Sequence, residues 1–156
     1  MIIYRFWDWE IEVDTAETAE VQRSRPSGSP EKCGCLHCKN FVAVRDSAYP
    51  AEFLELLERL GIPVDRESEI YHCGEIEPRL HFYGGWFHFV GRIVHGPETH
   101  TGGPTGGPIE LKPISETFSL GFTRQLGLVP KSFRADNLGQ LEFSTKVPWV
   151  LEQPPE

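Results

Sequence analysis

The chain has 156 residues, a formal net charge of −8 and an aromatic content of 12%. That length suits a single domain, residues 1–156, which buries roughly 70% of the surface of its unfolded chain. The negative charge argues against nucleic acid or an anionic membrane as partner, since both require a basic surface, and it favours a basic protein partner. The start has no signal-peptide pattern, and no apolar run approaches the ~18 residues of a membrane span. We therefore expect a cytoplasmic protein.

The first 31 residues divide into a strand region and a polar segment. Trp9, Ile11 and Val13 alternate with acidic residues, a pattern typical of a half-buried strand. The stretch 15–31 is polar and contains a cluster of Ser, Pro and Gly, which favours a loop. We expect this loop to be flexible.

Two helices are predicted next, at about 36–48 and 50–60. Apolar residues at helical spacing indicate the first. The second has a stripe of Phe and Leu residues, with Pro50 at its first position and Gly61 as a left-handed cap.

From Glu69 onward the pattern indicates strands. Aromatic residues on both sides of Gly84-Gly85 predict a hairpin over 79–92 with a tight turn at the two glycines. In that register one face is apolar and belongs to the core. The opposite face places two imidazoles across from each other and forms a candidate binding surface. Its members are His81, Tyr83, Trp86 and His88.

The remaining chain continues the strand pattern. Alternating apolar residues predict strands at 118–122 and 141–147, separated from the hairpin by a Gly/Pro-rich stretch, 96–108, expected to be a flexible loop. A short Pro-rich tail ends the chain. Strands first, then helices, then more strands joined by turns define an α+β fold. We expect a mainly antiparallel sheet with the helices at 36–48 and 50–60 packed on one face.

Four cysteines carry the strongest chemical signal. Cys33, Cys35 and Cys38 fall within six residues, and Cys73 follows on a later strand. Close thiolates repel one another unless they are protonated, oxidised or bound to a metal, and zinc favours sets of three or four thiolates. The sequence thus predicts a zinc site at these four residues, with His37 and His72 as alternative ligands.

Two alternatives to metal binding remain open. Cys35 and Cys38 form a C-x-x-C pair at a helix start, where a helix N-terminus and a nearby imidazole lower a thiol pKa, as thiol redox chemistry requires. The strand that precedes such a pair in thioredoxin-like proteins is absent from the sequence pattern. The cysteines can equally be reduced residues that pack as small hydrophobes.

Two segments, Cys-Gly-Cys-x-x-Cys-x-Asn-Phe (33–41) and Tyr-Gly-Gly-Trp-Phe-His-Phe-Val-Gly (83–91), resemble uncharacterised bacterial proteins. The resemblance covers about residues 33–150 and implies no activity and no site. From the residues we predict a small acidic cytosolic protein, a non-enzymatic protein-interaction module with a Cys-rich zinc site. The alternative is an enzyme, either a thiol oxidoreductase or a metal-dependent enzyme that uses Cys35, Cys38 and a nearby His.

Overall fold

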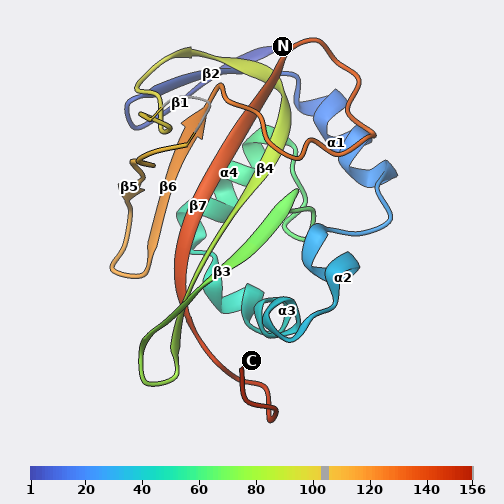
Figure 1. Cartoon of the computed structure of the whole chain (residues 1–156). Helices are drawn as coiled ribbons and strands as arrows, with labels where there is room; N and C mark the ends of the chain where they lie inside the picture. Colours follow the sequence, from blue (N-terminus) through green and yellow to red (C-terminus); the bar gives the residue numbers. More distant parts are fainter. Residues whose placement is uncertain (103–105, 156) are drawn as a thin grey trace.

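A computed structural model describes residues 1–102 and 106–155. The fold is α+β, as predicted, with a mainly antiparallel seven-stranded sheet in the order β1-β2-β4-β7-β6-β5 and β3 paired to β4 (Figure 1). The helices are α1 (Thr15–Ser24), α2 (Ser29–Cys33), α3 (Leu36–Ala48) and α4 (Ala51–Leu60). The strands are β1 (Ile2–Phe6), β2 (Trp9–Val13), β3 (Glu69–Glu77), β4 (Leu80–His95), β5 (Lys112–Pro113), β6 (Phe118–Thr123) and β7 (Leu138–Pro148).

The long strand β4 is the centre of the sheet. One of its edges pairs with β7 over Leu80–Val90. The other edge pairs with β3 as far as Trp86 and with β2 from Gly91 onward. Between them, α1 supplies side-chain partners to the strand: Gln22 Nε2 donates to the His88 carbonyl at 2.9 Å, and the Val90 N–H donates to Thr18 Oγ1 at 2.9 Å. Helix α1 thus takes the place of a strand along this part of the edge.

Helices α3 and α4 cover one face of the sheet and bury an aromatic core, with α4 visible behind β4 and β7 in Figure 1. Phe53 of α4 lies 4.7 Å from Phe118 and 5.6 Å from Phe143, measured between ring centroids. Both helix predictions are confirmed to within one residue at each end. At the end of α4, Gly61 adopts φ 83° and its N–H bonds to the carbonyls of Leu57 and Glu58, as expected for a left-handed cap.

The prediction of a loop over 15–31 is wrong, because this stretch forms α1 and α2. Asp14 caps α1 by accepting from the Glu17 N–H at 3.0 Å. The helix was not apparent in the sequence because its buried face consists of polar residues, Thr18 and Gln22, whose partners are backbone groups of β4. The hydrophobic periodicity that normally indicates a helix is therefore missing.

The hairpin turn predicted at Gly84-Gly85 is also wrong. Both glycines lie inside β4, and the turn is at 78–79, where Arg79 adopts φ 66°. A Cβ on Gly84 would overlap the Tyr71 ring of β3, and a Cβ on Gly85 would lie 2.5 Å from the Glu69 carbonyl oxygen. The glycines are therefore needed for the close approach of the neighbouring strand rather than for a turn.

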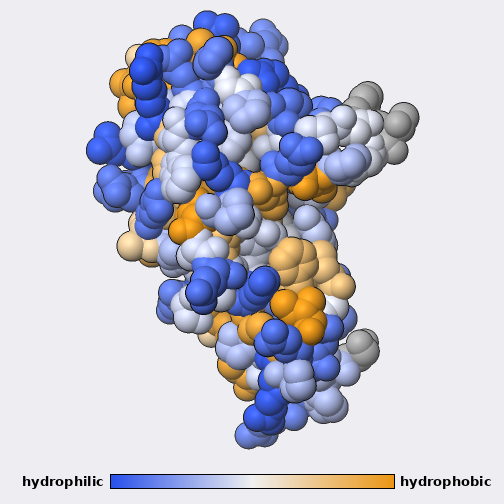
Figure 2. Space-filling view, turned by 90° about the vertical axis from the view of Figure 1, so that its left-hand side faces the viewer, coloured by the Kyte–Doolittle hydropathy of each residue, from blue (hydrophilic) through white to orange (hydrophobic). Residues whose placement is uncertain are grey.

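The described part of 96–108 packs along β6. The Thr99 N–H bonds to the Phe122 carbonyl at 3.2 Å, and His100 forms an isolated bridge with Ile109; residues 103–105 of this predicted loop lie outside the described residues. Figure 2 shows the side that carries β5 and β6, where hydrophobic residues form separate patches within a largely hydrophilic surface. Among the described residues, no helix combines the length and the apolar character needed to cross a membrane.

Candidate metal centre

The cysteine cluster lies where α2 meets α3. Cys33 is the last residue of α2, Gly34 reverses the chain with φ 67°, and Cys35 is the N-cap of α3. Cys38 follows in the first turn of α3. The Sγ atoms of these three cysteines all lie within 4.8 Å of one another, and all four cysteines of the chain are free thiols. The cluster could therefore hold a metal ion.

The three thiols differ in exposure and in acidity. Cys33 and Cys35 are exposed, and Cys38 is buried. The backbone amide of Cys38 lowers the pKa of Cys35 below its ordinary value by favouring the thiolate. Burial, and then the neighbouring thiols, raise the pKa of Cys38. A metal ion would reverse the second effect, because a coordinating thiol loses its proton.

Cys73, the predicted fourth ligand, is not in this group. The pairing of β3 with β4 matches His72 to Tyr83 and Gly74 to Phe82, so that Cys73 is the extra residue of a bulge, and it is exposed. His72 is the residue that faces the head of α3. A one-residue bulge cannot be predicted from the alternating pattern, and it decides which of the two neighbours turns inward.

Neither alternative ligand joins the thiols either. His37 and His72 instead stack on each other, with centroids 3.9 Å apart and planes 8° from parallel, and His72 Nε2 is 2.8 Å from His81 Nδ1. Burial lowers the pKa of His72 to about 4, with further contributions from His37 and His81. The three imidazoles form a row beside the cysteine cluster, with Trp149 next to His81 at a centroid distance of 5.1 Å.

The predicted binding surface does not form as one exposed face. Because β4 continues through Gly84 and Gly85, His81 and Tyr83 face α3, whereas Trp86 and His88 face the opposite side of the sheet. His81, Tyr83 and His88 are buried, and Trp86 is half-buried. The Tyr83 hydroxyl donates to the His37 carbonyl at 2.8 Å, and Trp86 Nε1 donates to the Gly127 carbonyl at 2.9 Å.

On the sheet face opposite α3 and α4, His88 belongs to a buried polar chain that the sequence did not indicate. The Gly127 N–H donates to Gln140 Oε1 at 2.8 Å, which fixes the orientation of that amide. His88 Nε2 therefore donates to Gln140 Oε1 at 2.9 Å, and His88 Nδ1 accepts from the Ser68 hydroxyl at 2.7 Å. Gln140 Nε2 in turn donates to Glu142 at 2.7 Å, and Glu142 also bonds His100. We call this set of five side chains the His88 network.

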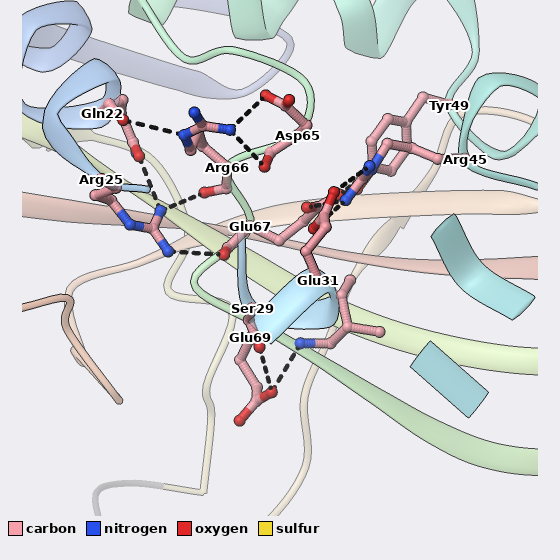
Figure 3. Close-up of polar contacts among 11 residues, drawn as sticks. Gln22, Arg25, Ser29, Glu31, Arg45, Tyr49, Asp65, Arg66, Glu67 and Glu69 are labelled. Carbon is pink, nitrogen blue, oxygen red and sulfur yellow. Dashed lines mark hydrogen bonds and ion pairs between the residues drawn. The ribbon is translucent and has the colours of Figure 1, made fainter. Parts of the chain in front are cut away.

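A second unpredicted network centres on the fully buried Glu67 (Figure 3). Its carboxylate accepts from Arg45 Nε at 2.9 Å and Nη2 at 2.8 Å, and from the Tyr49 hydroxyl at 2.5 Å. Burial raises the pKa of Glu67, against the opposing effect of Arg45. Arg45 also binds Glu31 of α2. In the sequence Glu67 is one acidic residue in an irregular segment, and its importance depends on partners distant along the chain.

The fold and the site together define a class: an α+β protein with a three-cysteine cluster, at a junction of two helices, that could hold a metal ion. Comparison of the chain with protein-family models, with curated proteins and with solved structures finds no match.

Proposed function

We propose that the protein binds a zinc ion through Cys33, Cys35 and Cys38 and serves as a non-enzymatic protein-interaction module. The observation that supports zinc is the mutual approach of three free Sγ atoms within 4.8 Å. Thiolates are soft ligands that select zinc over magnesium or calcium. Three protein ligands leave a fourth position of a tetrahedral ion for water or for a group from a partner.

The net charge of −8 supports a basic protein as the partner, because opposite charge raises the rate of encounter and suppresses association with acidic molecules. Cys33 and Cys35 are exposed, so that an ion held between them and Cys38 would be accessible from the surface. A zinc ion there would hold α2 against α3 and keep this junction in one arrangement.

Metal analysis of the purified protein tests the zinc proposal. We expect one zinc per chain, and one cobalt in the zinc-free protein after cobalt is added, with thiolate-to-cobalt charge-transfer absorption. Serine at any one of the three positions should lower zinc affinity by more than tenfold in competition with a chelator. Cys73→Ser is the matched control and should bind as the wild type does. Four freely reactive thiols with no metal uptake would contradict the proposal.

A thiol oxidoreductase is the second candidate, supported by the asymmetry of Cys35 and Cys38. Cys35 is exposed, lies at the N-terminus of a 13-residue helix and has a lowered pKa, whereas Cys38 is buried with a raised pKa. An attacking thiolate and a resolving thiol differ in this way. Disulfide reduction by the metal-free protein that is lost in Cys35→Ser and kept in Cys33→Ser would favour this function over zinc binding.

A further inference from the structure

The three cysteines of the cluster come from two helices. Cys35 and Cys38 belong to the N-terminal end of α3, whereas Cys33 ends α2. The five residues of α2 are too few for a helix to be stable by itself in water. Gly34, the single residue between Cys33 and Cys35, has the widest backbone freedom of any residue type. Something besides the local chain must therefore hold Cys33 beside the other two thiols.

Arg45 joins the two helices by side-chain hydrogen bonds. From α3 its Nη1 and Nη2 atoms bind the two carboxylate oxygens of Glu31 on α2, at 2.8 and 3.0 Å. Such a two-bonded pair fixes orientation as well as distance. The same guanidinium binds the buried Glu67 through two further bonds, which orient the Arg45 side chain (Figure 3). Burial disfavours its charge, but the hydrogen bonds to Glu31 and Glu67 outweigh that effect and raise the pKa of Arg45.

The segment before β3 and the first residue of β3 hold the first turn of α2. The Ser29 N–H donates to the Glu67 carbonyl at 2.9 Å, and the Ser29 hydroxyl donates to Glu69 at 3.1 Å. Gly28, the N-cap of α2, lies so close to this segment that a Cβ would be 2.5 Å from the Asp65 carbonyl oxygen and 3.0 Å from Glu67 Oε1. Helix α2 is thus fixed at Ser29 by the segment around Glu67 and at Glu31 by Arg45.

We propose that the Arg45–Glu31 pair is a positioning device for the cysteine cluster, which holds Cys33 against Cys35 and Cys38. The inference rests on the proposed zinc site for its consequence, but the juxtaposition of the thiols is a property of the metal-free chain. Glu31 is the informative residue to change. Its side chain is 32% exposed, and Arg45 keeps the buried partner Glu67 when Glu31 is removed.

The first experiment measures zinc affinity by competition with a chelator. Glu31→Ala should lower the affinity by about tenfold, because zinc binding must then also bring Cys33 to the other two thiols. Glu31→Gln should have a smaller effect because its amide oxygen still accepts one bond. Glu58→Ala, which removes an exposed charge from α4, should leave affinity unchanged. The effect of Glu31→Ala should persist in high salt, which screens a simple charge effect. Unchanged affinity in Glu31→Ala would overturn the inference.

The second experiment needs no metal and separates the inference from the zinc proposal. In Cys35→Ser/Cys73→Ser protein, the two remaining cysteines, Cys33 and Cys38, form a disulfide in equilibrium with glutathione. The two protein thiols give up two electrons and two protons to oxidised glutathione, which leaves as two glutathione thiols. The equilibrium gives the effective concentration of one thiol at the other. Adding Glu31→Ala should lower this value by about tenfold.

The matched pair is Cys35 and Cys38 in a Cys33→Ser/Cys73→Ser background. Both thiols then belong to α3, so Glu31→Ala should leave their effective concentration unchanged. A fall for the Cys33–Cys38 pair alone supports the inference, whereas an equal change in both pairs, or in neither, overturns it. If the wild type binds no zinc, the proposed function fails, and the two disulfide equilibria still decide the role of Arg45 and Glu31.

Discussion

The cysteine cluster and the His88 network both contain side chains that can bind a metal ion or a proton, but they differ in exposure and in hydrogen bonding. In the His88 network, the imidazole of His88 is fully buried and both of its nitrogens are hydrogen-bonded. In the cluster, two of the three thiols are exposed and their sulfurs face one another. A buried group with satisfied hydrogen bonds contributes to stability and specificity of the fold. Exposed thiols whose sulfurs converge remain able to bind a metal ion, which is why we place the proposed metal site at the cysteines.

If this distinction is right, the largest stability effects lie in the buried polar networks. Arg45→Met should lower the free energy of unfolding by about 3–5 kcal/mol, because it leaves the Glu67 carboxyl buried without its ion partner. Urea unfolding of the metal-free protein measures the change. Arg59→Met, which removes an exposed pair with Glu55, should cost less than about 1 kcal/mol. Equal losses would show that the Glu67 network is not buried as described.

The pH dependence of stability sharpens the comparison next. Burial lowers the pKa of His88 from 6.5 to about 4, and Gln140 only partly counteracts it. The folded state therefore disfavours the charged imidazole. The contribution of neutral His88 to the free energy of unfolding is fully present above pH 6.5. It is lost as pH falls toward 4, and the total loss is about 3 kcal/mol. His88→Gln should flatten this part of the profile relative to the wild type. Parallel profiles would contradict the assignment of His88 as a buried neutral group.

The smallest expected effects concern the thiols in the metal-free protein. Cys38→Ser should lower the free energy of unfolding by about 1–2 kcal/mol, because a hydroxyl then replaces a buried thiol without an assured partner. Cys33→Ser and Cys73→Ser, both at exposed positions, should change it by less than about 0.5 kcal/mol. The same unfolding measurement checks all three variants. A large loss in Cys33→Ser would assign a structural role to a thiol that we consider free to bind.

The sequence predicted those features that depend on neighbouring residues. The bounds of α3 and α4 follow from apolar spacing and from Gly61, and the closeness of Cys35 and Cys38 follows from their place in the first turn of one helix. These are short-range effects, which a single chain records directly.

The errors all involve partners far away in the sequence. Gly84 has a reason to be glycine only once the Tyr71 ring is placed over it. Helix α1 is stabilised through a face that bonds to β4, and Cys73 is turned away by a bulge that depends on strand register. Local pattern carries no record of such contacts, so the hairpin turn and the loop were predicted wrongly, and the position of Cys73 outside the cluster could not be foreseen.

The substitution of α1 for a strand beside β4 has a consequence for association between molecules. Unpaired N–H and C=O groups on a sheet edge are a template on which a strand from another chain can add. The Gln22 side chain bonds the His88 carbonyl, and the Thr18 side chain bonds the Val90 N–H. Side chains cannot propagate a ladder. Helix α1 therefore protects this edge: it satisfies backbone hydrogen-bonding groups in the middle of β4, so that a strand from another molecule cannot pair there.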